Sequence, residues 1–354
     1  MSIPLILEFV VALALLILIH EFGHFLAARL LKVDVEEFGI GFPPRALTLF
    51  TSKGTRFSLN WLPFGGFVRL KGENDPSIPG SFANAKPWVR ITILLAGPMA
   101  NLLTGVLMYT AIFLYTGVPD FDRVQIVNIA EQSPAAEAGL LAGDIVLAVN
   151  GEEINSTDEL SALLRNSVDQ SITITIERDG QVSEVSATPL SSRSAEEGAL
   201  GVMISNPLRR DGALMAFPAG ILAVGLHSQE MFGFVGKLVQ GDISPQEGRL
   251  VGYKGMYDLY EQARESDPAQ GVPSTVITLG FFTSITISLG LLNLLPIPAL
   301  DGGRIMFIIP EIILHRRVPQ NYESIVHLVS FGLLLLLMIY INLQDFINPV
   351  QIGP

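Results

Sequence analysis

Four long apolar stretches dominate the sequence and restrict what the chain can fold into. They cover residues 3–31, 89–114, 276–295 and 325–343. Each is near or above the roughly 20 residues that an α-helix needs to cross the hydrocarbon core of a membrane. Charged residues make up only 16% of the chain, against about 25% in soluble proteins. The sequence therefore predicts a polytopic α-helical membrane protein with four transmembrane helices.

The first apolar stretch differs from a cleavable signal peptide. No Lys or Arg precedes Arg29, so the basic start of a signal peptide is missing, and His20 and Glu21 interrupt the stretch. We expect a span that the mature protein retains.

The basic residues predict the orientation of the spans. Nine Lys or Arg residues lie in or beside the loop between the first two stretches, and Arg304, Arg316 and Arg317 lie between the last two. Cytoplasmic loops carry such an excess. We therefore expect a multi-pass protein of the cell (inner) membrane with both termini and segment 119–273 extracytoplasmic. The net charge of −12 argues against nucleic acid as a partner.

A compact β-rich domain is expected at residues 122–190. Strand candidates lie at 124–129, 145–149, 172–176 and 182–188, and Asn150-Gly151 is typical of a tight hairpin turn. The runs Ser-Pro-Ala-Ala-Glu-Ala-Gly-Leu from residue 133 and Ala-Gly-Asp-Ile-Val from residue 142 resemble a bacterial PDZ domain. That resemblance implies a groove that binds a peptide ligand by strand addition, although a passive spacer domain remains an alternative.

Two further elements are expected outside the spans. Residues 36–49 and 56–70 read as strands around the turn 52–54, and their many aromatic residues favour a β-hairpin associated with the membrane over a surface hairpin. Residues 213–226 form an apolar run of only about 14 residues, which favours a helix on the membrane surface, with a fifth span as the alternative. The predicted division is 1–121 (two spans and the hairpin), 122–190 (PDZ domain), 191–273 (linker with the surface helix) and 274–354 (two spans).

The first span contains the sequence His20-Glu21-Phe22-Gly23-His24. Residues i and i+4 share one face of a helix, so His20 and His24 can bind one metal ion, with Glu21 placed to take a proton from a metal-bound water. Nitrogen and oxygen ligands in this pattern favour zinc, and the chain has no cysteine to offer instead. A closed structural metal site and a proton pathway in a transporter are the alternatives.

A third metal ligand is expected at the end of the third span, which reads Asn293-Leu-Leu-Pro-Ile-Pro-Ala-Leu-Asp301-Gly-Gly. Pro296 and Pro298 end the helix there. Irregular backbone at membrane depth is tolerated only when it is buried in protein or lines a wet cavity. Asp301 is therefore the candidate, at a membrane depth that matches His20 and His24 near the cytoplasmic side.

His-Glu-x-x-His in the first span and Asn-x-x-Pro-x-Pro-x-Leu-Asp-Gly in the third together resemble the site-2 protease family, in its bacterial form with a single PDZ domain. The resemblance implies Zn²⁺ bound by His20, His24 and Asp301, with Glu21 as general base and Asn293 in contact with the substrate. It also identifies Gly97 and Asn101 as the family's Gly-x-x-x-Asn element, with Asn101 near the substrate or joining helices.

The activity that the resemblance implies is hydrolysis of peptide bonds within transmembrane segments of single-span membrane proteins, such as anti-sigma factors or signal-peptide remnants. A catalytically silent membrane scaffold that gathers partners through its PDZ domain is the alternative. That alternative requires a lost ligand or base, and the sequence keeps all four residues.

Overall fold

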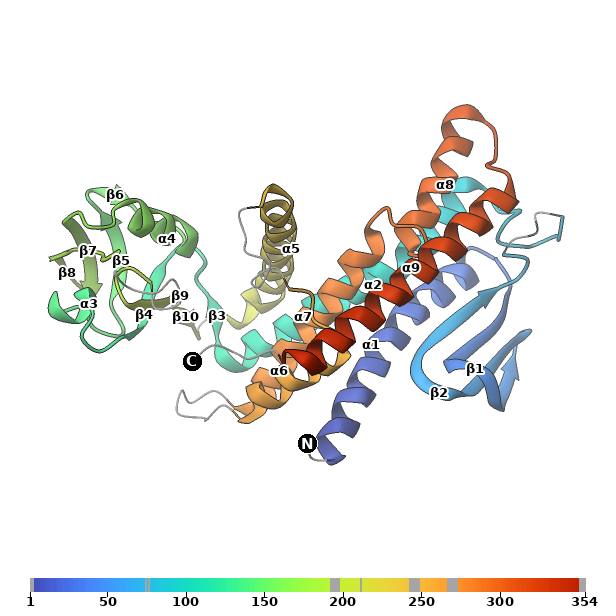
Figure 1. Ribbon diagram of the computed structural model, residues 1–354, viewed down its shortest axis with the longest axis horizontal. Coiled ribbons are helices and arrows are strands. Elements are labelled where there is room, and N and C mark those ends of the chain that lie inside the picture. The colour runs from blue at the N-terminus through green and yellow to red at the C-terminus, as the bar shows by residue number, and fades with distance from the viewer. Residues whose placement is uncertain are drawn as a thin grey trace. The chain divides into compact units, whose positions relative to one another are not determined.

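The computed structural model describes residues 3–73, 75, 77–191, 198–210, 212–241, 249–265 and 273–349 (Figure 1). The chain divides into two compact units, which we describe separately. A mainly helical unit contains the residues up to 112 and those from 220 onward, and a β domain contains residues 113–219.

In the described parts of the chain, four helices are long and apolar enough to cross a membrane, as the sequence predicted. They are α1 (Ile3–Leu30), α2 (Pro87–Thr116), α7 (Ser274–Leu294) and α9 (Gln320–Ile347). A shorter helix, α8 (Asp301–Leu314), follows the break after α7. The sequence analysis treated that segment as a loop between spans.

Two more helices lie in the segment that was expected to be a linker, α5 (Ala216–Gln240) and α6 (Tyr253–Glu265). A short 3-10 turn at Ala213–Met215 precedes α5. The expectation that this helix ends near residue 226 is wrong. The polar residues that follow, among them Gln229 and Glu230, are good helix formers, and the chain first takes up a left-handed conformation at Gly241.

Helices α1 and α2 approach each other closely because glycine lies at their contact. A Cβ atom on Gly23 would come within 2.9 Å of the Cβ of Ala100 and would also collide with the backbone of Ala96. Small residues allow such close packing of helices in membranes, where dispersion contacts replace the hydrophobic effect. The close approach brings the middle of α2 directly against the two histidines of α1.

Helix α9 is joined to the start of α6 by one buried carboxylate. Asp345, which is completely buried, accepts hydrogen bonds from the backbone nitrogens of Gly252 and Gly255 at 2.8 and 3.0 Å and from Arg249 at 2.7 Å. A carboxylate on the unpaired N–H groups at a helix N-terminus is favourable in charge and hydrogen bonding. This contact anchors one end of α9.

The predicted hairpin is present as β1 (Val35–Ser52) and β2 (Thr55–Leu70), which pair antiparallel. Both strands bend, so that Phe38 pairs with Phe57 on one side and with Val68 on the other. The end of β2 is consequently the outer strand on one side. The buried carboxylate of Glu37 accepts two hydrogen bonds from Arg45 at 2.8 and 2.9 Å, and Arg69 lies 3.5 Å away. These ion pairs fix the bent hairpin.

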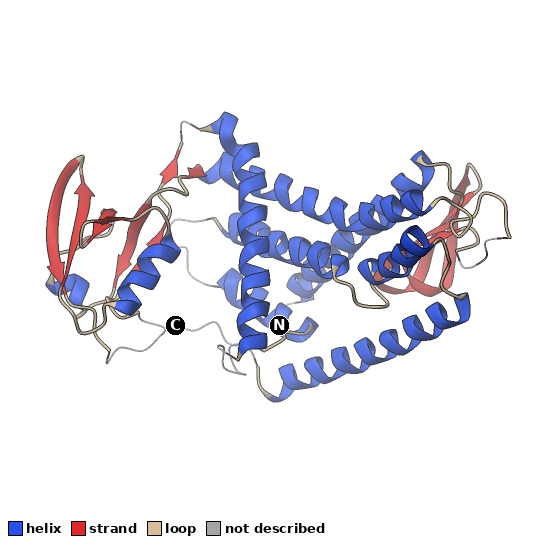
Figure 2. Cartoon of the chain, turned by 90° about the horizontal axis from the view of Figure 1, so that it is seen from above, coloured by secondary structure: helices blue, strands red, loops and turns tan. Residues whose placement is uncertain are grey.

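The β domain contains a sheet in the order β8-β7-β5-β4-β9, with β6 beside β5. Its strands are the red arrows on the left of Figure 2. The strands are β4 (Val124–Ile129), β5 (Ile145–Val149), β6 (Glu152–Glu153), β7 (Ile172–Arg178), β8 (Gln181–Ala187) and β9 (Val202–Ser205). The short helices α3 (Pro134–Glu137) and α4 (Thr157–Asn166) accompany the sheet.

The sheet extends beyond the expected boundary at residue 190. Strand β9, which pairs with β4, lies in the segment that the sequence analysis treated as a linker. Two short strands, β3 (Val118–Pro119) and β10 (Leu208–Arg209), pair where the chain enters and leaves the domain. Four residues of alternating burial in β9 are too short a pattern to recognise in a sequence.

Candidate active site

Three side chains from distant parts of the sequence meet inside the helical unit. His20 and His24 lie one turn apart on α1, and Asp301 is the first residue of α8. An oxygen of Asp301 lies 3.1 Å from Nε2 of His20 and 3.2 Å from Nε2 of His24, and the two Nε2 atoms are 3.2 Å apart. All three residues are largely buried.

This triangle fits a metal ion. Ligands at about 2.0–2.1 Å in a tetrahedral arrangement are roughly 3.3 Å from one another, which is close to the three separations observed. Nitrogen and carboxylate oxygen are both suitable ligands for zinc and related metals. Without a cation, two imidazole nitrogens and a carboxylate oxygen would lie close together. A single proton between them could form a hydrogen bond between only two of these three atoms.

The backbone around Asp301 explains how the third side chain reaches the site. Helix α7 ends at Leu294, and Ala299 has φ of +81°, a left-handed conformation that is uncommon for a residue with a Cβ. A Cβ on Gly302 or Gly303 would collide with the carbonyl groups of the preceding loop. The loop therefore folds tightly onto the start of α8, and only glycine fits at these two positions.

The two histidines are oriented by α2. Nδ1 of His24 donates a hydrogen bond to the carbonyl oxygen of Ile93 at 2.8 Å, which leaves Nε2 with its lone pair toward the site. The side-chain nitrogen of Asn101 lies 3.4 Å from Nδ1 of His20. Asn101 is completely buried and its backbone carbonyl oxygen accepts a hydrogen bond from Thr286 of α7 at 3.3 Å.

From the sequence, Asn101 was a candidate for substrate contact or for joining helices. In the structure Asn101 lies behind His20 and is not among the residues that line the cavity of the site. Its contacts join α1, α2 and α7.

Gly97, the other member of the Gly-x-x-x-Asn element, faces both histidines. A Cβ at this position would lie 2.5 Å from Cε1 of His24 and 2.9 Å from Nε2 of His20, and would also collide with Nε2 of His24. The absence of a side chain at Gly97 therefore leaves room for the imidazoles to turn toward Asp301. This is a second observation that fits a metal ion at the triangle.

The site opens into a cavity of about 380 Å³. Its lining includes the three candidate ligands, Glu21 and Asn293, together with the end of β2 (Phe67, Val68, Arg69, Leu70), Glu73, Ile93, Leu94, Ala299 and Arg304. Glu21 is half-buried beside the backbone of Val68. The side-chain nitrogen of Asn293 donates to the carbonyl oxygen of Leu289 at 2.9 Å, one turn earlier in α7.

The structure adds an ion pair that the sequence analysis missed. Arg304, one turn after Asp301, pairs with Glu73 of the loop that follows β2. The signal in the sequence that could have indicated it was Arg304 itself, which lies three residues, or about one helical turn, after the candidate ligand Asp301. Both residues line the cavity.

The comparisons with known proteins identify the family. The family model for Peptidase family M50 matches residues 8–337. The chain belongs to peptidase family M50. The resemblance to site-2 proteases drawn from the two motifs is thereby confirmed.

Several M50 relatives match along nearly their whole length. The Campylobacter jejuni protein named "Putative zinc metalloprotease Cj1068" is 34% identical, over 95% of this chain and 91% of its own. The Bacillus subtilis "Regulator of sigma-W protease RasP" is 24% identical, over 98% of this chain and 99% of its own. Among solved structures, the PDZ domain of an SdrC-like protein from Listeria monocytogenes is 18% identical, with a TM-score of 0.22, over 24% of this chain and 88% of its own.

Proposed function

We propose that this M50 peptidase is a zinc-dependent intramembrane endopeptidase that cleaves transmembrane segments of single-span membrane proteins. The observation that carries the proposal is the convergence of His20, His24 and Asp301, from a span and a helix start 277 positions further on, beside Glu21 in one cavity. Ionisable residues within a membrane span are costly and are usually retained for function.

Zinc is the metal that this set of ligands fits. His20, His24 and Asp301 would hold it, and three protein ligands are typical of catalytic rather than structural zinc sites. When bound, zinc supplies Lewis acidity and lowers the pKa of a water molecule to about 7. The relatives whose names describe them as zinc metalloproteases support this assignment.

Two observations support Glu21 as the general base. It follows His20 directly in α1 and lines the same cavity as the candidate ligands. Its carboxylate would accept a proton from the attacking water and deliver it to the departing amide nitrogen. Asn293 lines the cavity on the α7 side, and its amide would donate a hydrogen bond to the carbonyl oxygen on which negative charge develops.

The end of β2 would hold the substrate. A transmembrane helix conceals its peptide bonds in internal hydrogen bonds, so a substrate must unwind before attack. Val68 and its neighbours form the outer strand of the hairpin and line the cavity. An unwound segment would add to this edge by main-chain hydrogen bonds and would pass Glu21, which lies beside Val68.

The substrates and their route are part of the proposal. The Bacillus subtilis relative carries the name of a sigma-W regulator, and we propose anti-sigma factors or signal-peptide remnants as substrates here. In the orientation predicted from Lys and Arg, the β domain lies outside the cytoplasm. It would then screen substrates by the size of their outer domains, while cleavage takes place near the cytoplasmic side of the membrane.

The first experiment is zinc content per chain in detergent-purified protein, wild type beside Asp301→Ala. We expect about one zinc ion per wild-type chain, as three-ligand sites bind, and a clear loss in the variant. Well-folded wild-type protein that takes up no zinc when zinc is supplied would contradict the proposal. Zinc retained by Asp301→Ala would remove Asp301 from the ligand set.

A further inference from the structure

The loop that delivers Asp301 has few ways to hold its shape. In residues 295–300, Pro296 and Pro298 have no N–H to donate. The N–H of Leu295 donates to Leu292 at 3.0 Å, and those of Ile297 and Leu300 donate to residues within the loop, at 2.7 and 3.1 Å. All three bonds are local in sequence, so none of them ties the loop to any helix other than α7, which it follows directly.

The remaining N–H of this loop, that of Ala299, donates to a side chain of α9. The acceptor is Nδ1 of His327, at 2.9 Å. Ala299 is the residue with φ of +81° and lies two positions before Asp301. The hydrogen bond therefore acts on the most strained point of the loop, next to the candidate ligand.

His327 also contacts the helix that begins at Asp301. Its ring lies 5.2 Å from the ring of Phe307, six positions after Asp301 on α8. His327 thus contacts the chain on both sides of Asp301, once before it and once after it. Asp345 anchors the opposite end of α9 to α6, so α9 offers a fixed support from which His327 can act.

The hydrogen bond defines the tautomer of His327. Because Nδ1 accepts from Ala299, the neutral ring carries its proton on Nε2. Nε2 is buried, has no hydrogen-bond partner among the described residues, and lies 3.9 Å from Glu323, too far for a hydrogen bond. The contact with Ala299 is therefore the polar interaction that holds this ring in place.

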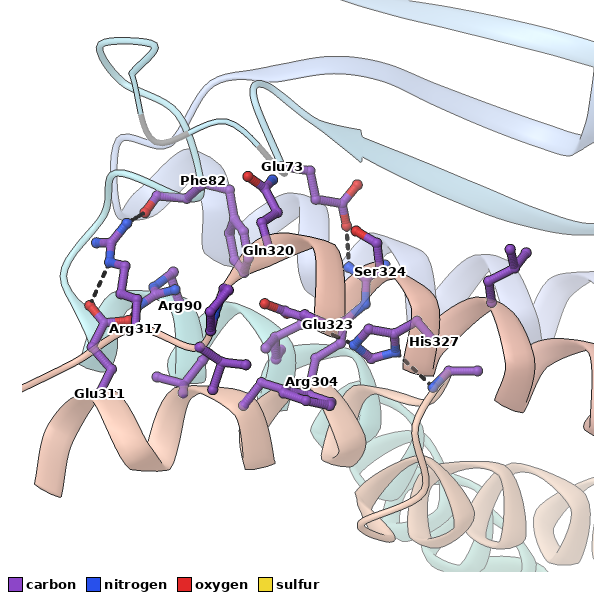
Figure 3. Close-up of a pocket in the computed structure, with 18 of the residues that line it drawn as sticks. Glu73, Phe82, Arg90, Arg304, Glu311, Arg317, Gln320, Glu323, Ser324 and His327 are labelled. Carbon is purple, nitrogen blue, oxygen red and sulfur yellow. Dashed lines mark hydrogen bonds and ion pairs between the residues drawn. The ribbon is translucent and has the colours of Figure 1, made fainter. Parts of the chain in front are cut away.

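His327 lines a cavity of about 650 Å³ that lies next to the active-site cavity (Figure 3). The two cavities share Glu73, Leu94, Ala299 and Arg304 in their linings. Figure 3 shows the Arg304–Glu73 ion pair close to His327. His327 lines the larger cavity and is not among the residues that line the active-site cavity, so it can support Asp301 without occupying the space of metal or substrate.

We propose that His327 is a positioning residue, whose Nδ1 holds Ala299 and thereby keeps Asp301 in the metal-binding position. The inference rests on the proposed function, since it requires Asp301 to bind the metal. Without the acceptor, the N–H of Ala299 loses its hydrogen-bond partner, and the loop relaxes to find another one. Asp301 moves with it, because only Leu300 lies between.

The test compares two substitutions of similar size. In His327→Asn the amide oxygen can occupy the position of Nδ1 and accept from Ala299, whereas in His327→Gln it reaches one bond further, toward the position of Nε2. Zinc affinity is measured by competition with a chelator in detergent-purified full-length protein. We expect His327→Gln to weaken zinc binding about tenfold or more, as loss of supporting partners of metal ligands does, and His327→Asn to remain close to wild type.

Ser324→Ala serves as the control, since Ser324 lines the same cavity one turn earlier on α9. It should bind zinc as wild type does. Equal zinc affinity in His327→Gln and wild type would overturn the inference, and so would an equal loss in the Asn and Gln variants, because the ring itself would then be what matters. A wild-type protein that binds no zinc would instead contradict the proposed function, which separates the two failures.

Discussion

The amide of Asn101 lies against the edge of the His20 ring that faces away from Asp301, with its nitrogen 3.4 Å from Nδ1. The amide oxygen of Asn101 is buried without a hydrogen-bond partner among the described residues. A half-turn of the amide would bring this oxygen to Nδ1 and pair it with the ring proton. His20 would then present the lone pair of Nε2 to a metal.

Asn101→Leu is therefore expected to weaken zinc binding about tenfold or more, the usual cost of losing a hydrogen-bond partner of a metal-bound histidine. Asn101→Asp keeps an oxygen at the same place and should retain most of the affinity. Chelator competition on purified protein measures both. If the Leu variant bound zinc as tightly as wild type, Asn101 would only join helices.

Gly97→Ala should abolish or strongly reduce zinc binding, because the new Cβ would lie 2.5 Å from Cε1 of His24 and would collide with Nε2 of the same ring. The imidazoles would have to turn away from Asp301. Gly280→Ala on α7 is the matched control, since a Cβ there would meet nothing within 4 Å. Zinc content per chain is the measurement. Zinc binding undiminished in Gly97→Ala would show that α1 and α2 can separate without loss of the site.

Glu21→Gln should bind zinc normally but cleave a membrane-protein substrate about 100-fold more slowly or worse, the usual loss on removing a general base. The substitution preserves size and removes only the ability to accept a proton. Parallel assays of zinc content and of cleavage in reconstituted vesicles separate the two effects. Cleavage at the wild-type rate would exclude Glu21 as the base.

The β domain should lose stability in acid through Asp144. This buried carboxylate accepts hydrogen bonds from Nε and Nη2 of Arg178 at 2.6 and 2.7 Å, and from the N–H of Leu141 at 2.8 Å. Burial alone would raise the pKa of Asp144, but the hydrogen bonds from Arg178 hold that pKa below its ordinary value. Its stabilising effect is therefore fully present above the unfolded pKa of about 3.9 and is lost as the pH falls toward the lower folded pKa.

Asp144→Asn should accordingly lower the free energy of unfolding at pH 7 by about 2 kcal/mol, which is typical of hydrogen bonds to charged groups. The free energy of unfolding of this variant should also fall less steeply below pH 5 than that of the wild type. Urea unfolding of residues 113–219, a compact unit with its own apolar core, measures this. Glu153→Gln, at an exposed carboxylate, is the control. An unchanged acid dependence in Asp144→Asn would contradict the assignment.

Removal of the β domain should relax substrate choice. The predicted domain was 122–190, but the pairing of β9 with β4 shows that the domain extends further. The deletion therefore replaces residues 120–207 with a short Gly/Ser linker. This linker joins β3 to β10, which pair with each other. We expect substrates with bulky outer domains to be cleaved faster by the deleted protein, while trimmed substrates are cleaved equally. An unchanged preference would exclude a screening role.

Much of the architecture follows from local patterns. The four spans, the hairpin turn at Lys53-Gly54, the strand at 145–149 and the tight turn at Asn150-Gly151 lie where the sequence predicted them. Each depends on apolar run length, period or turn chemistry within a few residues. The placement of His20 and His24 on one face of α1 belongs to the same class, since helical geometry alone sets the i, i+4 relationship.

The local patterns also indicated Asp301, because a helix broken by two prolines at membrane depth must be buried in protein or line a wet cavity, where an acid can bind a metal. They did not indicate what supports it. Asn101 behind His20, Gly97 against the histidines, the Arg304–Glu73 pair and the contact of His327 with Ala299 all join segments that are distant in the sequence.

The sequence by itself therefore determined the four spans and indicated the candidate metal ligands and the candidate base. The tertiary structure alone decided which side chains orient the ligands and which strand edge lines the cavity. The physical reason is the separation along the chain over which each kind of interaction acts. Hydrophobic period and turn preference act between neighbours in the chain, whereas the contact of Ala299 with His327, 28 positions apart, depends on how closely and at which rotation the helices pack.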